Sequence, residues 1–281
     1  MARPHVEFIQ AQALPWSEGS LARVRPGVEQ KTLSEDPDSG AATLVVHYPA
    51  GFNIPAAPRI GAAEEVLVLD GEIRFGPHHL RRDAYGYFPQ GTAHGAISSD
   101  SGAVLLTFFD AAVLAETTTE GSQDTAIVID TVTMPWSAGN PDSGLKHMGL
   151  LRKVLRNDSD RQERTLLLSM APQGYPSGMA GVQICHPCVE EMYLLSGDLI
   201  SEYGIGHGGA YFWRPPQIPH GPHGSHGGAF MLIRFVQGSH RNDWTDNKRE
   251  FLLKPSYQPA LPDGLHDLER LGNATLPSRN Y

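Results

Sequence analysis

The feature that most constrains this fold is an internal repeat, because the two halves of the chain follow one sequence pattern. L-P-W-S-E-G-S at Leu14–Ser20 recurs as M-P-W-S-A-G-N at Met134–Asn140, a shift of 120 residues. E-E-V-L-V-L-D-G-E-I, which starts at Glu64, matches E-E-M-Y-L-L-S-G-D-L, which starts at Glu190, at a shift of 126 residues. A shift that grows slowly along the chain indicates two homologous modules that differ by a few loop residues.

The repeat also sets the expected domain boundaries. Ala42–Val46 matches Arg164–Leu168 at a shift of 122 residues, which lies between the two shifts above. We therefore expect an N-terminal module over residues 1–120 and a C-terminal module over residues 121–281. The polar stretch Ala115–Asp124 is the expected linker, and a proline-rich tail is expected from about residue 240. This tail should pack as an extended arm on a barrel or on a neighbouring subunit.

Turn residues and short apolar runs predict an all-β fold. The chain has 30 glycines and 22 prolines, spread throughout rather than clustered. Each module has a strand that begins at paired glutamates and ends at a glycine, Gly71 or Gly197. Short strands at this spacing, without helical stretches between them, favour an antiparallel sandwich or barrel. The other expected strands are Thr43–His47, Tyr85–Phe88 and Val104–Phe109 in the first module, and Thr165–Ser169, Tyr211–Trp213 and Phe230–Val236 in the second.

Composition limits the partners of the chain. A formal charge of −9 without a basic cluster argues against nucleic acid and anionic membranes. No apolar run approaches the roughly 20 residues that span a bilayer, and we see no signal peptide. The two cysteines, Cys185 and Cys188, lie too close together in the sequence for a disulfide between them to stabilise a domain, so we expect a reducing cytoplasm. We expect the ligand to be a small molecule.

Metal chemistry is the leading functional idea for the second module. His186 and Glu190 precede an apolar run, and His220 follows the next expected strand in P-P-Q-I-P-H. Imidazole and carboxylate ligands suit Fe(II), Mn(II), Zn(II) or Ni(II), and three protein ligands leave open positions for water or substrate. The alternative is a vacant barrel whose polar residues pair with one another and with water.

Several further residues have both a functional and a structural interpretation. Cys188 is a possible replacement ligand, whereas the C-x-x-C that it forms with Cys185 lacks the context of a redox motif. Glu191 should point away from Glu190, as a salt-bridging or supporting group. Arg214 could hold a carboxylate or carbonyl group of a substrate, but we expect an exposed charge at the rim.

Candidates for acid–base catalysis are equally open. His223 could be an extra ligand or an acid–base group, since its ordinary pKa lies near neutrality. The alternative is that His223 and His226 belong to a flexible, solvated glycine-rich loop, which we favour. Tyr193 is a second catalytic candidate, and with Tyr211 and Trp213 it could line a binding pocket or simply form core.

These residues resemble the motifs of the cupin superfamily. The first motif of that family has two histidines, a glutamate and a glycine, and His186, Glu190 and Gly197 match it. The second has a proline, a glycine and a histidine, and Pro215 and His220 match it, although Gln217 replaces the internal glycine. The resemblance covers both modules and implies two tandem jelly-roll (double-stranded β-helix) barrels, as in a bicupin. It is greatest to small cupins of the anti-sigma-factor sensor and diketone-cleaving dioxygenase types.

Departures from the motifs are as informative as the matches. Ile184 stands where the first histidine of the family is expected in the second module. In the first module both histidine positions are lost, to Pro58 and Ile60, and only Glu64 and His94 remain. The first module should therefore be a degenerate, mainly structural barrel.

The resemblance implies three candidate functions. The first is a dioxygenase that uses Fe(II), or else Zn, Mn or Ni, held by His186, Glu190 and His220, and acts on a carbonyl- or enol-containing substrate. The second is a non-catalytic domain that binds or senses a metal or small molecule. The third is an isomerase or lyase that uses acid–base chemistry. A fold alone does not choose among them. Duplicated barrels with an extended tail also suggest a homodimer.

Overall fold

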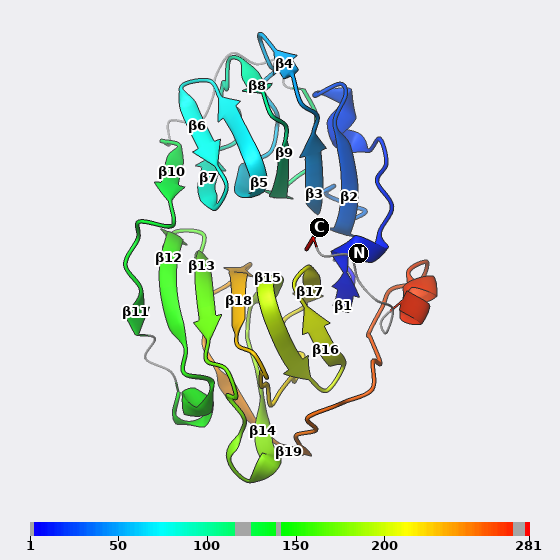
Figure 1. Ribbon diagram of the computed structural model, residues 1–281, viewed down its shortest axis with the longest axis vertical. Coiled ribbons are helices and arrows are strands. Elements are labelled where there is room, and N and C mark those ends of the chain that lie inside the picture. The colour runs from blue at the N-terminus through cyan, green and yellow to red at the C-terminus, as the bar shows by residue number, and fades with distance from the viewer. Residues whose placement is uncertain (1–2, 116–124, 139–141, 272–278) are drawn as a thin grey trace. The chain divides into compact units, whose positions relative to one another are not determined.

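The computed structural model describes residues 3–115, 125–138, 142–271 and 279–281, and the chain forms two compact units (Figure 1). The first unit contains Met1–Arg3 and Leu14–Met134, and the second contains Pro4–Ala13 and Pro135–Tyr281. The N-terminal strand thus belongs to the second unit, which the predicted ranges 1–120 and 121–281 did not anticipate. Most of the expected linker, residues 116–124, lies outside the described residues.

The first unit is an antiparallel barrel of nine strands. Its main sheet has the order β10-β7-β5-β9-β3-β2, and the far half of β5 pairs with β6 and β8, which in turn pairs with β4. Its elements are the 3-10 helix η2 (Ser20–Arg23) and the strands β2 (Glu29–Glu35), β3 (Ala42–Tyr48), β4 (Phe52–Ile54), β5 (Glu64–Phe75), β6 (His78–Arg81), β7 (Ala84–Phe88), β8 (Ile97–Ser99), β9 (Ala103–Phe109) and β10 (Ile127–Asp130).

The second unit repeats this plan. Its main sheet has the order β1-β17-β15-β18-β13-β12-β11, with β16 paired to β15, and β14 and β19 form a separate two-stranded sheet. Its strands are β1 (Val6–Gln10), β11 (Ser137–Ala138), β12 (Leu151–Asp158), β13 (Glu163–Met170), β14 (Ala180–Cys185), β15 (Val189–Ser201), β16 (Gly204–His207), β17 (Ala210–Arg214), β18 (Ala229–Val236) and β19 (Asp243–Glu250). Its 3-10 helices are η1 (Ala11–Ala13), η3 (Ser143–Met148), η4 (Ser177–Met179) and η5 (His266–Leu271). The prediction of an all-β fold with two tandem jelly-roll barrels is confirmed.

The strands that begin at the paired glutamates differ from the prediction at their far ends. Gly71 and Gly197 do not end β5 and β15, because each strand continues and pairs with the next hairpin strand. Both glycines have positive φ, and a Cβ on either would lie 2.0 Å from the carbonyl oxygen of Gly102 or Gly228. Only glycine fits this bend, which allows one long strand to pair with different strands before and after the glycine.

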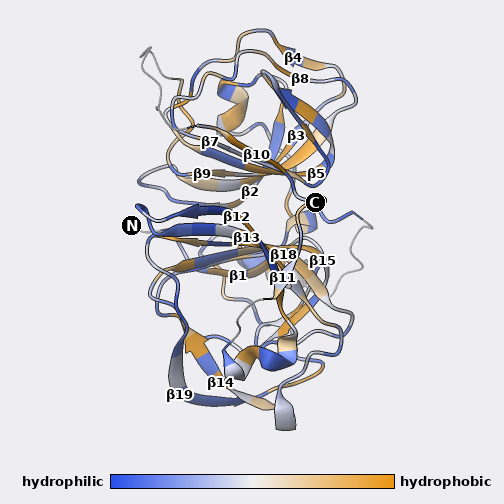
Figure 2. Ribbon diagram, turned by 90° about the vertical axis from the view of Figure 1, so that its left-hand side faces the viewer, coloured by the Kyte–Doolittle hydropathy of each residue, from blue (hydrophilic) through white to orange (hydrophobic). Residues whose placement is uncertain are grey.

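Apolar side chains fill the interior of each barrel, and in Figure 2 the hydrophobic colour follows the central strands. The first barrel has a continuous core that includes Tyr48, Phe75 and Phe109. The core of the second includes Met192 and Ile233, and it also borders a cavity of about 190 Å³. The described residues contain no helix that is long and apolar enough to cross a membrane.

The tail packs on the second barrel, which is one of the two arrangements expected for it. Strand β19 pairs with β14. Beyond it, the Tyr257 hydroxyl donates to the Phe8 carbonyl at 2.7 Å, and the Gln258 N–H donates to the Tyr203 carbonyl at 2.9 Å. The tail therefore adds a two-stranded sheet and a strap to the barrel that carries the predicted site.

Candidate metal centre

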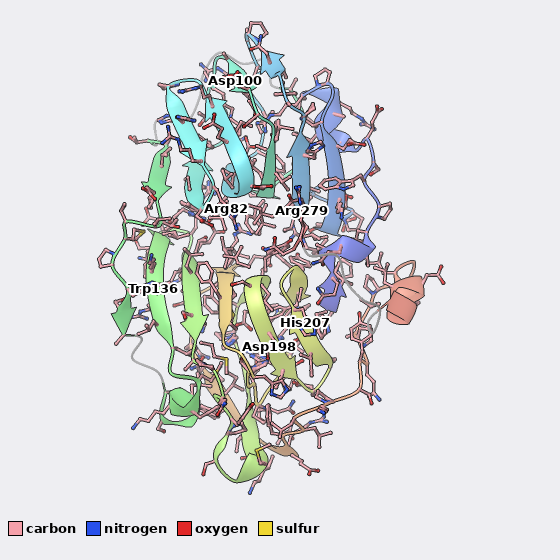
Figure 3. The ribbon with its side chains drawn as sticks, in the orientation of Figure 1. Arg82, Asp100, Trp136, Asp198, His207 and Arg279 are labelled. Carbon is pink, nitrogen blue, oxygen red and sulfur yellow. The ribbon has the colours of Figure 1, made fainter. Side chains whose placement is uncertain are left out.

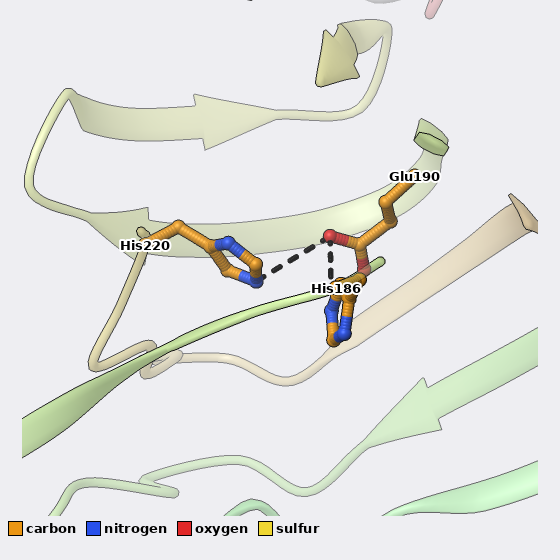
Figure 4. A group of neighbouring side chains, drawn as sticks. All are labelled: His186, Glu190 and His220. Atoms are coloured by element: carbon orange, nitrogen blue, oxygen red, sulfur yellow. Dashed lines mark ion pairs between the residues drawn. The ribbon is translucent and has the colours of Figure 1, made fainter. Parts of the chain in front are cut away.

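Three predicted side chains come together in the second barrel (Figure 4). His186 follows β14, Glu190 lies on β15, and His220 lies in the loop between β17 and β18. Nε2 of His186 is 3.6 Å and Nε2 of His220 is 3.5 Å from Oε2 of Glu190. Their donor atoms all lie within 4.8 Å of one another, and within the described ranges no other group of His, Cys, Asp or Glu side chains meets this criterion.

Hydrogen bonds fix the orientation of both imidazole rings. Nδ1 of His186 lies 2.9 Å from the carbonyl of Arg241, and Nδ1 of His220 lies 2.9 Å from the carbonyl of Ile218. Because a carbonyl only accepts, each Nδ1 carries a proton, and in the neutral ring Nε2 then has the lone pair. Both lone pairs are therefore available beside the Glu190 carboxylate, an arrangement typical of histidine metal ligands.

Burial keeps the His220 ring neutral. The pKa of His220 is lowered well below 6.5, first by burial and then by the positive charge of Arg214. A neutral imidazole is the form that binds a metal ion, so this ring does not need to lose a proton near neutral pH.

Arg214 is buried beside the three side chains, so the prediction of an exposed rim charge is wrong. Its side chain is 2% exposed, and Nη1 donates to Oε2 of Glu190. Its Nε donates to Oε2 of Glu7 at 2.9 Å, and Nη2 donates to Oε1 of Glu7. Glu7 lies on β1, more than 200 residues away in the sequence, so no local pattern could reveal this partner. The guanidinium thus contacts Oε2 of Glu190, the same carboxylate oxygen that lies 3.6 and 3.5 Å from the two imidazoles.

Ile184 replaces a ligand with an apolar wall. Its backbone pairs with that of His220 through N–H to O distances of 3.0 and 2.9 Å. Its side chain is buried and lines the cavity beside the three donor groups. The residue thus anchors the loop of His220 but offers no donor atom for a metal.

Neither cysteine belongs to the donor group. Both are free and buried. Cys188 belongs to the apolar core, and burial, followed by the charge of Glu190, raises its pKa to about 11. The Cys185 thiol lies 3.4 Å from the side-chain oxygen of Gln217. A neutral thiol in the core is a poor metal ligand, so the structure gives no support to Cys188 as a replacement for the missing histidine.

The residue next to Glu190 points to the other face of the sheet, as predicted. Glu191 pairs with Arg234 at 2.6 Å and accepts a hydrogen bond from the Tyr211 hydroxyl at 2.7 Å. Tyr193 has the same parity on β15, and its hydroxyl donates to the carbonyl of Asn280. The cavity is lined instead by their neighbours with the parity of Glu190, so neither Tyr193 nor Tyr211 faces it.

The glycine-rich loop after His220 is held by specific contacts rather than solvated. His226 bonds to the Tyr175 hydroxyl at 2.8 Å, and its backbone N–H donates to Asp198, a residue labelled in Figure 3, at 2.7 Å. His223 lines the cavity, and its ring centroid is 5.6 Å from that of His220. Burial and the charge of Arg214 lower the pKa of His223 to about 4. His223 is therefore the acid–base candidate that the structure brings to the site.

Sequence reasoning missed His240, which lies beyond β18. Its ring centroid is 3.7 Å from that of Phe235 and 4.8 Å from that of His186. Burial lowers its pKa to about 4. No motif contains this residue, and the fold of the tail alone brings it to the cavity.

The cavity combines an apolar interior with a polar edge. Apolar residues make up most of its wall, and they include Leu145, Met148, Leu150, Leu166, Leu168, Ile184, Met192, Leu199, Phe212, Met231, Ile233 and Phe235. The polar residues that line it are Asp142, Arg152, Arg164, His186, Glu190, His220, His223, His240 and Asn242. Its volume of about 190 Å³ is below the roughly 300–1,000 Å³ of pockets that hold drug-sized ligands, so a ligand here would be smaller than those.

The corresponding place in the first barrel holds an arginine. Nη1 and Nη2 of Arg25 donate to the two carboxylate oxygens of Glu64 at 2.6 and 2.5 Å, and Nη1 also donates to Tyr48 at 2.7 Å. His94 completes the cluster, with its Nε2 3.2 Å from Glu64. A guanidinium that takes both oxygens of the carboxylate supplies the positive charge that a metal would otherwise bring, which accounts for the loss of the other ligands.

Comparisons with known proteins agree with this architecture. The model of the ChrR cupin-like domain matches the sequence twice, over residues 5–113 and 124–238. No curated protein matches the chain. A candidate dioxygenase from Nostoc punctiforme is 20% identical and superposes with a TM-score of 0.71 over 89% of this chain and 87% of that one.

Two further structures share the fold at lower identity. A variant of oxalate decarboxylase from Bacillus subtilis is 12% identical, with a TM-score of 0.53 over 85% of this chain and 79% of that one. A candidate glyoxylate-induced protein from Pseudomonas aeruginosa is 11% identical, with a TM-score of 0.57 over 90% and 94% of the respective chains. At these identities the similarity shows the shared fold.

Proposed function

Since the chain belongs to the ChrR cupin-like family, we propose that it is a metal-dependent oxygenase whose second barrel holds a divalent first-row metal ion. The substrate is a small molecule that contains a carbonyl or enol group. One observation carries the proposal: two imidazole lone pairs and one carboxylate meet at the wall of an apolar cavity.

The donor set fits such an ion. His186, Glu190 and His220 offer two neutral nitrogens and one anionic oxygen, a combination that suits Fe(II), Mn(II), Zn(II) and Ni(II). Fe(II) is favoured by the similarity to diketone-cleaving dioxygenases and to the candidate dioxygenase from Nostoc punctiforme. A bound metal would supply Lewis-acid and redox chemistry at this position.

The protein would contribute positioning and a dry environment. The carbonyls of Arg241 and Ile218 hold the two imidazoles, while Arg214 holds Glu190. The apolar wall excludes water from the reacting part of a substrate, which strengthens electrostatic interactions there. The ring of His223 lies beside His220, where it can accept or return a proton of the substrate.

Two alternatives have specific support. A domain that only binds or senses a ligand is favoured by the contact of Arg214 with Glu190 and by the missing ligand at Ile184. An isomerase or lyase that works by acid–base chemistry is favoured by His223 and His240, which both line the cavity. Ligand-induced stabilisation without turnover would indicate a binding or sensing domain. Turnover by metal-free protein would indicate an isomerase or lyase.

Oxygen consumption tests the proposal. Purified protein would be reconstituted separately with Fe(II), Mn(II), Zn(II) and Ni(II) and then supplied with small β-diketones. We expect oxygen uptake that depends on substrate and metal in the wild type and is lost in His220→Ala. Failure to retain any of the four metals, together with identical behaviour of wild type and His220→Ala, would overturn the proposal.

A further inference from the structure

Strand register places an arginine in the same layer of the second barrel as Glu190. Arg164 on β13 lies opposite Phe235 on β18, and Phe235 lies opposite Glu190 on β15. Since neighbouring strands are about 4.8 Å apart, the Cα atoms of Arg164 and Glu190 lie about 10 Å from each other. Both residues line the cavity, so Arg164 borders the same space as the three donor groups.

Arg164 has no carboxylate partner among the residues that the structure describes. Its Nε donates to the side-chain oxygen of Asn157 at 3.0 Å. Arg214 by contrast is engaged by two carboxylates, and the cavity residue Asp142 accepts hydrogen bonds from Trp244 and Asn242. A guanidinium has five N–H donors in a planar fork, so the two terminal nitrogens of Arg164 are available to a ligand.

The first barrel provides an internal comparison. There Ala42 on β3 lies opposite Phe109, which lies opposite Glu64, so Ala42 holds the place of Arg164. Ala42 is buried, and its barrel packs a continuous core without an arginine at this position. The fold therefore does not require Arg164, and the arginine is present in the barrel that has the open cavity.

We infer that Arg164 binds the carboxylate of a small substrate whose apolar part lies in the cavity. A guanidinium recognises a carboxylate through two parallel charge-assisted hydrogen bonds. Leu166 and Leu168 follow Arg164 along the same face of β13, so the apolar surface begins directly beside the charge. This inference rests on the proposed function only for the second contact, in which the carbonyl or enol group of the same substrate lies at the metal centre.

The test compares two probes of equal length, hexanoate and hexanamide, on metal-free protein. Calorimetric titration of the wild type should show hexanoate binding about 10- to 100-fold more tightly than hexanamide, the range of one charged hydrogen-bonding contact. Arg164→Ala, which installs the residue found in the first barrel, should lose this preference. Arg164→Lys should keep part of it, and Arg249→Ala on the exposed strand β19 should keep all of it.

Metal content, measured on the same preparations after reconstitution with Fe(II) or Zn(II) and removal of free metal, separates this inference from the proposed function. A wild type that holds no metal but shows a preference dependent on Arg164 would remove the metal proposal and leave this one. Wild-type protein that does not bind hexanoate, or that binds both probes equally, would overturn the inference. So would a preference unchanged in Arg164→Ala, provided that circular dichroism shows this variant to be folded.

Discussion

The two barrels use an arginine differently beside the same glutamate. Arg25 donates hydrogen bonds to both carboxylate oxygens of Glu64. Arg214 is shared between Glu190 and Glu7, which supplies most of its hydrogen bonds. Only Oε2 of Glu190 is bonded to Arg214, and the same oxygen lies near both imidazoles. We infer that Glu7 keeps Arg214 from neutralising Glu190 as completely as Arg25 neutralises Glu64.

Removal of Glu7 should destabilise the second barrel. Burial alone would raise the pKa of Glu7, but the charge of Arg214 lowers it to about 2, so the carboxylate is ionised in the folded protein. Glu7→Gln would leave part of the Arg214 charge uncompensated inside the protein, at a cost of about 3 kcal/mol. Urea unfolding of this barrel measures the loss. Glu250→Gln, an exposed change on β19, is the control, and equal stability of the two variants would contradict the prediction.

The buried pair in the first barrel should make stability depend on pH. Burial alone would raise the pKa of Glu64, but the charge and hydrogen bonds of Arg25 lower it from 4.5 to about 2. A depressed pKa stabilises the folded state above pH 4.5, and this contribution is lost as the pH falls toward 2. The difference between the two pKa values corresponds to about 3 kcal/mol. The free energy of unfolding of wild type should exceed that of Glu64→Gln at pH 6 and converge with it at pH 2. A gap independent of pH would refute this origin.

At the scale of elements, the local pattern predicted the central strands closely. The expected strands Thr43–His47, Val104–Phe109 and Phe230–Val236 correspond to β3, β9 and β18, which are longer by one or two residues. Hydrophobic runs between turn residues suffice for such strands. The pairing of β14 with β19 and of β1 with β17 was not predicted, because each joins segments far apart in the chain.

The bend in β15 gives a prediction at this scale. Gly197→Ala would combine a positive φ with a Cβ placed 2.0 Å from the Gly228 carbonyl oxygen, so we expect a loss of more than about 3 kcal/mol. Gly178→Ala is a matched control, since Gly178 also has a positive φ but nothing within 4 Å of its Cβ position. It should cost only about 1 kcal/mol. Thermal unfolding compares the two, and similar losses would show that the close approach to Gly228 is unimportant.

At the scale of the whole molecule, the repeat predicted two barrels of one plan, and it singled out the second as the one that keeps a candidate site. The motif spacing predicted that His186, Glu190 and His220 would converge. It could not predict the ion pair of Arg25 with Glu64 or that of Arg214 with Glu7, because each joins residues far apart in the sequence. The identity of the metal, a homodimer and a cytoplasmic location stay predictions.

Metal content per chain tests the central claim most directly. His94 and His220 hold corresponding places in the two barrels, so His94→Ala and His220→Ala form a matched pair. After reconstitution with Fe(II) or Zn(II) and removal of free metal, elemental analysis should find one ion per chain in wild type and in His94→Ala, and none in His220→Ala. Equal metal content in wild type and His220→Ala, or loss of the ion in His94→Ala alone, would contradict a metal centre in the second barrel.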